Sequence, residues 1–117
     1  DSVFLVAPTS SDQRLKSISE ASQGFLYLVA RVGVTGTHSD VDASVPETVA
    51  RIRQYSDLPI AVGFGIKSSE DVQKVWNHAE GAVVGSAIVE FIEEHRSDSN
   101  LGVKVEEFVK KDLILKL

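Results

Sequence analysis

Cysteine and methionine are both absent from this 117-residue chain. Without cysteine there is no disulfide framework and no thiolate zinc site, which fits a reducing compartment. Basic residues are also in deficit, with 12 Lys and Arg against 17 Asp and Glu, and no stretch concentrates them. Because a nucleic-acid surface needs such a concentration, we expect no nucleic-acid partner and only a small anion as ligand.

Long hydrophobic runs are missing as well. The longest, such as Phe25 to Ala30, are far shorter than the roughly 20 residues that cross a bilayer. We therefore expect no membrane association and a cytoplasmic location, with the plastid stroma also allowed. The chain opens on an apolar run without an initiator Met, so we expect its start to be a truncation point.

What is present is the composition of a globular protein, with 43% hydrophobic and 25% charged residues. Four short apolar runs are each followed by a helical pattern. Because the runs do not alternate apolar with polar residues, they suit parallel strands covered by helices. The runs are Val3 to Ala7, Phe25 to Ala30, Pro59 to Gly63 and Gly81 to Val84. A complete (β/α)₈ (TIM) barrel needs about 250 residues, so residues 1–117 predict an α/β fold of a single half-barrel unit.

The expected helices follow from caps and apolar spacing. The third begins at Ser68 with acids in its first turn and carries Trp76 on its packed side with Val72 and Val75. The first helix is expected to start at Ser10 or Ser11. The second should run from about Pro46 to Tyr55 and the fourth from about Ser86 to His95, and a last helix from about Val103 to Leu113 closes the chain. The long connection from Arg31 to Val45 is of the length and kind that usually serves function.

Glycine corners give the clearest functional signal. Gly63-Phe64-Gly65 and Gly85-Ser86 each end a strand and lead to a helix. Glycine lets backbone N–H groups approach a ligand, and the start of a helix stabilises an anion. A tight turn is the alternative for either corner alone. In (β/α)₈ enzymes the phosphate site often follows strands seven and eight, so two successive corners predict phosphate binding in the C-terminal half of a barrel.

Catalytic groups are harder to find. Asp40 and Asp42 lie in the long connection and are expected to be solvated, whereas Glu70 and Asp71 suit a helix start. Tyr27 either reaches the pocket or fills the barrel.

The remaining candidates lack a pattern. Ser86 has no nucleophile-elbow motif. Arg31 either approaches a phosphate or pairs with an acid. The three histidines show no metal-ligand spacing, so we expect surface groups and no metal site: His38, His78 and His95.

Four segments together resemble the tryptophan synthase α subunit family over essentially the whole chain. They are Phe25 to Arg31, Gly33-Val34-Thr35-Gly36, Pro59 to Ile66 and Gly81 to Val89. The resemblance begins at the family's fifth barrel strand. It implies retro-aldol cleavage of indole-3-glycerol phosphate to indole and glyceraldehyde 3-phosphate without a cofactor, and a β subunit as partner.

By matching motifs, the resemblance implies phosphate binding by Gly36, Gly65, Gly85 and Ser86. Thr35 would belong to a mobile loop, and Phe64 and Tyr27 would line the indole pocket. The family's two catalytic carboxylates come from its second strand and the following loop, which have no counterpart here. We therefore assign no catalytic residue and expect the isolated chain to be inactive.

Two alternatives remain: a non-catalytic half-barrel that binds a phosphorylated metabolite or assists assembly, and another phosphate-binding barrel enzyme. A half-barrel also has two unpaired sheet edges. We expect a missing N-terminal half-barrel, self-association, or disorder near Val3 to Ala7.

Overall fold

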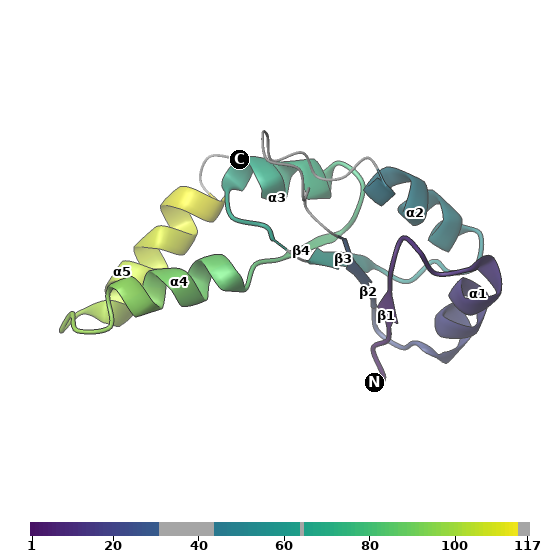
Figure 1. Ribbon diagram of the computed structural model, residues 1–117, viewed down its shortest axis with the longest axis horizontal. Coiled ribbons are helices and arrows are strands. Elements are labelled where there is room, and N and C mark those ends of the chain that lie inside the picture. The colour runs from purple at the N-terminus through teal and green to yellow at the C-terminus, as the bar shows by residue number, and fades with distance from the viewer. Residues whose placement is uncertain (31–43, 64, 115–117) are drawn as a thin grey trace.

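The computed structural model describes residues 1–30, 44–63 and 65–114 (Figure 1). Within these ranges, four strands form one sheet in the order β1-β2-β3-β4, and every neighbouring pair is parallel. The strands are β1 (Leu5–Val6), β2 (Leu26–Val29), β3 (Ile60–Gly63) and β4 (Gly81–Val83). The expected parallel strands alternating with helices are confirmed, although β1 is shorter than its apolar run.

Helices connect the strands and close the described chain. They are α1 (Asp12–Ala21), α2 (Ser44–Arg53), α3 (Ser69–Trp76), α4 (Ser86–Glu94) and α5 (Leu101–Phe108), which continues as a π-helical segment, η1 (Val109–Ile114). Ser11 is the residue that caps α1, because its Oγ accepts a hydrogen bond from the Arg14 N–H at 3.3 Å. α2 begins before the expected Pro46, a first-turn position that tolerates proline.

The core lies between one face of the sheet and the first three helices. Leu28 and Ile60 are fully buried on this face, as are Leu15 of α1, Ile52 of α2 and Val75 of α3. Figure 1 shows α2 and α3 on the same side of the sheet. Apolar burial on this face holds the strands and helices in one unit.

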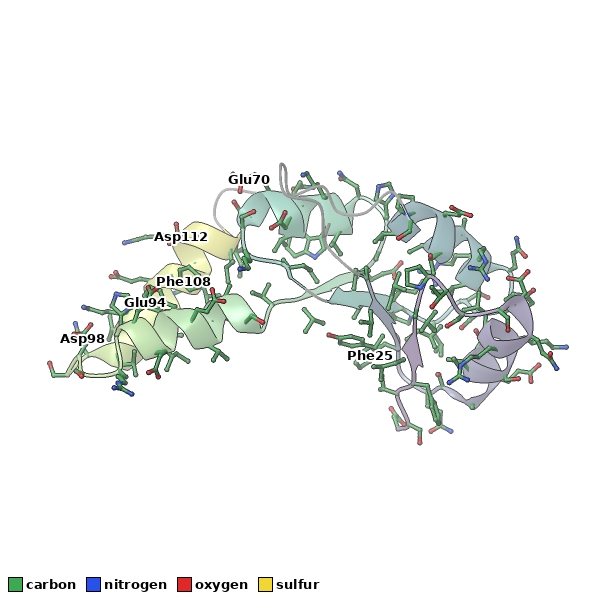
Figure 2. The ribbon with its side chains drawn as sticks, viewed as in Figure 1. Phe25, Glu70, Glu94, Asp98, Phe108 and Asp112 are labelled. Carbon is green, nitrogen blue, oxygen red and sulfur yellow. The ribbon has the colours of Figure 1, made fainter. Side chains whose placement is uncertain are left out.

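The opposite face of the sheet is open. Register places Leu5, Tyr27, Ala61 and Gly81 in one row, and Val29, Gly63 and Val83 in another. Phe25 shares this face, turned away from α2 and α3 (Figure 2). We call it the inner face, because alternate residues of barrel strands point to the interior. Leu5, on the edge strand β1 at one end of this face, is 62% exposed.

Helices α4 and α5 form a hairpin that extends away from the sheet (Figure 1). The rings of Phe91 and Phe108 stack between them with centroids 4.5 Å apart. His95 stacks on Phe91 at 4.1 Å, and its Nδ1 lies 2.9 Å from the Phe91 carbonyl oxygen. The expectation of a surface histidine is therefore wrong for the half-buried His95, whereas His78 is exposed.

Trp76 also differs from its expected position. It is exposed, whereas Val72, Val75 and Ala79 form the buried stripe of α3 and the turn that follows. That stripe has helical spacing, and Trp76 lies next to Val75 in the sequence, about 100° further around the helix. The packed side of α3 is thus completed by a small residue rather than by the tryptophan.

Candidate functional site

The two glycine corners lie at the same end of the sheet. Gly63 and Val83 are paired in the ladder between β3 and β4. Gly65 and Gly85 each follow this pair by two residues, so both lie at the carboxyl ends of neighbouring parallel strands, where ligands bind in such folds. Both are exposed. Gly65 has φ +73°, a left-handed conformation that glycine adopts without strain.

The start of α4 is open to a ligand. Gly85 is its N-cap, and no side chain of the described residues caps it. The Gly85 carbonyl accepts from the N–H groups of Ile88 and Val89 at 3.0 and 3.1 Å, and among the described residues no group accepts from the earlier N–H groups, which are the orphan donors of a helix start. A Cβ built on Gly85 would meet no atom within 4 Å.

Charge at this helix start also favours an anion. The first turn of α4 contains no acidic residue, so the partial positive charge of the helix is not neutralised within that turn. Ser86 follows Gly85 directly and is exposed, which makes its hydroxyl accessible. Backbone N–H groups, the helix dipole and this hydroxyl together make a site suited to a small anion.

The start of α3, which follows the Gly63-Phe64-Gly65 corner, was expected to offer N–H groups to an anion, but its N–H groups are engaged by its own side chains. Ser68 Oγ accepts from the Asp71 N–H at 3.2 Å, and Asp71 Oδ2 accepts from the Lys67 and Ser68 N–H groups at 3.1 and 3.3 Å. This capping box engages donors that a ligand would otherwise use. At this corner only the backbone of Gly65 is therefore available to an anion, because the start of α3 is capped. Asp71 is an acid at a helix start, as expected.

Tyr27 lies on the inner face, half-buried. A Cβ built on Gly63 would lie 2.8 Å from Cζ of Tyr27, closer than real Cβ contacts allow. The missing side chain at Gly63 thus makes room for the tyrosine ring beside the strand that leads to Gly65. Sequence reasoning treated Gly63 as the end of a strand and as part of a glycine corner, and predicted no contact with Tyr27. The available signal was a glycine inside a strand, which often marks a close approach.

A groove at the carboxyl ends of β1 and β2 was missed by sequence reasoning. Its volume is about 530 Å³, and its wall includes Leu5, Val29, Thr9, Ser10 and Arg14. Apolar strand residues and polar loop residues together suit a ligand of mixed character. The rule that ligands lie at carboxyl strand ends, applied to β1, would have pointed to it.

Several predicted residues lie outside the described residues: Arg31, Thr35, Gly36, His38, Asp40, Asp42 and Phe64. Among the described side chains, no three His, Asp or Glu groups gather as metal ligands. No helix in the described ranges has the length and apolar character needed to cross a membrane.

Parallel strands alternating with helices, with exposed glycine corners at neighbouring carboxyl ends, define this chain as half of a (β/α)₈ barrel. The family model described as tryptophan synthase alpha chain matches residues 1–114. The chain belongs to that family.

Individual relatives agree. The tryptophan synthase alpha chain of Solibacter usitatus is 42% identical over 111 residues, covering 95% of this chain and 42% of that protein. The protein of the same name from Methanocaldococcus jannaschii is 45% identical over 107 residues, covering 92% and 38%. A mutant tryptophan synthase alpha-subunit from Pyrococcus furiosus matches with a TM-score of 0.76 and 32% identity, covering 98% of this chain and 44% of that one. The chain thus spans about two fifths of the length of these relatives.

Proposed function

We propose that this chain is the phosphate-binding part of a tryptophan synthase α-type lyase. The reaction is the retro-aldol cleavage of indole-3-glycerol phosphate to indole and glyceraldehyde 3-phosphate in tryptophan biosynthesis. The observation that carries the proposal is the uncapped start of α4 beside the Gly65 corner, in a chain of the tryptophan synthase alpha family. A phosphate dianion is the part of this substrate that a helix start would stabilise.

Each site residue has a proposed role. Gly65 and Gly85 offer backbone N–H groups to the phosphate, and Ser86 adds its hydroxyl. Gly36 joins them from the preceding unit. These phosphate-binding roles are supported by the exposure of Gly65, Gly85 and Ser86 and by the free space around Gly85.

The indole moiety is assigned to the inner face. Tyr27 and Phe64 line its pocket, and Thr35 belongs to the loop that covers it. The position of the Tyr27 ring beside Gly63 supports the first of these roles, because it presents an aromatic surface near the phosphate corner. No cofactor is required for this reaction.

Catalysis requires a carboxylate of suitable pKa that the described residues do not supply at this end of the sheet. Asp71 is buried as a helix cap, and Asp12 pairs with Arg51 at 2.7 Å. We therefore assign no catalytic residue to this chain and expect no turnover from it alone. In the complete enzyme the proposed partner is the β subunit, in the cytoplasm.

The phosphate site is tested by two substitutions at one position. Gly85→Asp and Gly85→Asn both place a capping side chain at the start of α4, where a Cβ has free space, but only Asp adds negative charge. Glycerol 3-phosphate titrated into the isotope-labelled chain should shift the amide signals of Gly65, Gly85 and Ser86. We expect Gly85→Asp to weaken binding at least tenfold, about 1.4 kcal/mol, and Gly85→Asn to change it much less.

Far-ultraviolet circular dichroism of both variants controls for folding. Equal phosphate affinity in the two variants would contradict the proposed site. So would amide shifts confined to residues away from the two glycine corners.

A further inference from the structure

Lys67 lies at the start of α3, two residues after Gly65. Its backbone is held in place, because its N–H donates to Asp71 Oδ2 at 3.1 Å within the cap of α3. Its side chain is 62% exposed, and its Nζ lies 3.9 Å from Oε1 of Glu90 in α4. A fixed backbone with a long, exposed side chain lets the ammonium group change partners beside the Gly65 corner.

The contact with Glu90 places the Lys67 ammonium group near the start of α4. Glu90 follows Ser86 by four residues, so both lie on one face of the helix, with Cβ atoms about 5 to 6 Å apart. Helical side chains also lean toward the amino end of their helix, and for Glu90 that direction is toward Ser86. Lys67 therefore reaches from the first glycine corner to the side of the second.

Charges near the start of α4 are unevenly placed. Its first turn contains no acidic residue, and Glu90, one turn after Ser86, is the first carboxylate along the helix. The pair with Lys67 is weak, because both side chains are 62% exposed and the two atoms lie near the upper limit for an ion pair. A phosphate monoester carries about −1.5 to −2 charges at neutral pH, so it attracts an ammonium group more strongly than one carboxylate does.

We propose that Lys67 is a further phosphate-binding residue of this site and that Glu90 competes with the phosphate for it. The ammonium group adds a full positive charge to the backbone N–H groups of Gly65 and Gly85, which carry only partial charge. This inference rests on the proposed phosphate site. It adds a side chain whose charge favours a dianion over a neutral or singly charged ligand.

Charge substitutions test the role of Lys67. Glycerol 3-phosphate is titrated into the isotope-labelled chain at low salt, and its affinity is taken from the amide signals of Gly65, Gly85 and Ser86. Lys67→Gln should weaken binding about threefold to tenfold, which is the scale of one exposed charge next to a dianion. Lys67→Arg keeps the charge and should stay within about twofold of the unmodified chain. Glu90→Gln should tighten binding about twofold to threefold, because it removes the competing carboxylate.

Helix α1 offers a matched control. Lys16 pairs with Glu20 at the same 3.9 Å, and its side chain is 63% exposed, but α1 lies at the other end of the molecule from α4 (Figure 1). Lys16→Gln therefore removes one charge from the chain without removing one from the site, and it should leave phosphate affinity unchanged. Raising the salt to about 0.5 M should reduce the loss in Lys67→Gln, because screening weakens the attraction of an exposed charge.

Two outcomes would overturn this inference and leave the phosphate site standing. One is equal affinity in Lys67→Gln and Lys16→Gln, with amide shifts still centred on the glycine corners. The other is weaker binding in Glu90→Gln, since phosphate binding would then require the ion pair to stay intact. An absence of shifts at Gly65, Gly85 and Ser86 in the unmodified chain would overturn both this inference and the proposed site.

Discussion

Replacing Glu80 with alanine removes two separate interactions at the amino end of the sheet. Glu80 Oε2 accepts the N–H of Ile60 at 2.7 Å, and Nη2 of Arg53 donates to both Glu80 carboxylate oxygens at 2.7 and 2.8 Å. The Glu80 N–H donates in return to the Ile60 carbonyl at 3.1 Å. One side chain therefore links the end of α2 with the beginnings of β3 and β4.

The two interactions differ in expected strength. A hydrogen bond to a charged group contributes about 1.5 to 3 kcal/mol, and the lower end applies here because the Glu80 side chain is 52% exposed. An exposed ion pair contributes about 0.2 to 1 kcal/mol. We expect Glu80→Ala to lower the free energy of unfolding by about 2 kcal/mol. Glu80→Gln keeps an acceptor for Ile60 and should cost about 0.5 kcal/mol.

The pH dependence gives a further check. The Ile60 N–H bond, and after it the Arg53 guanidinium, lower the pKa of Glu80 below 4.5, while partial burial opposes them. Since the folded pKa lies below the unfolded one, this stabilisation is complete above pH 4.5 and is lost as pH falls through the folded pKa. Glu80→Gln should lack this part of the acid dependence.

The assay is urea unfolding, with all three proteins measured at the same concentration. The unmodified chain, Glu80→Ala and Glu80→Gln are compared at neutral pH and across the acid range. Equal losses in the two variants would refute the assigned role of the Ile60 bond. An unchanged acid dependence in Glu80→Gln would refute the assigned pKa shift.

Two other substitutions test local packing and capping. Gly63→Ala places a Cβ 2.8 Å from Cζ of Tyr27 and 3.1 Å from Cβ of Val83, so we expect a loss of about 1 to 3 kcal/mol in urea unfolding. The loss should shrink in a Tyr27→Ala background, and an equal loss there would locate the strain elsewhere. Ser68→Ala removes the cap of α3 and should cost about 1 kcal/mol, whereas no loss in thermal or urea unfolding would show that the cap contributes nothing.

Local sequence signals predicted much of the fold. Each described strand lies within an apolar run, and Ser68 caps α3 with acids in its first turn, as the sequence predicted. Gly85 precedes a helix whose start is open, again as the local pattern indicated. These features depend on residues that are neighbours in the sequence, and such short-range interactions follow from residue types and their spacing.

Side-chain placement was less predictable. Sequence reasoning left it open whether Tyr27 reaches the pocket or fills the barrel. It also predicted that Trp76 packs inward from α3, whereas Trp76 is exposed. The pairing of the Tyr27 ring with Gly63, and the joint contact of Glu80 with Ile60 and Arg53, were not foreseen. These contacts join residues from different elements, so they depend on how the strands align and how the helices pack against them.

The amino-acid sequence alone determined the order of strands and helices, the capped start of α3 and the glycine corners, because hydrophobic periodicity and backbone preference act locally. The tertiary structure decided which side chains of the strands meet, such as the Tyr27 ring beside Gly63, and how Gly65 and Gly85 come to the same end of the sheet. The reason is physical: strand register and helix packing arise from burying surfaces that are far apart in the chain, and only the folded arrangement satisfies them together.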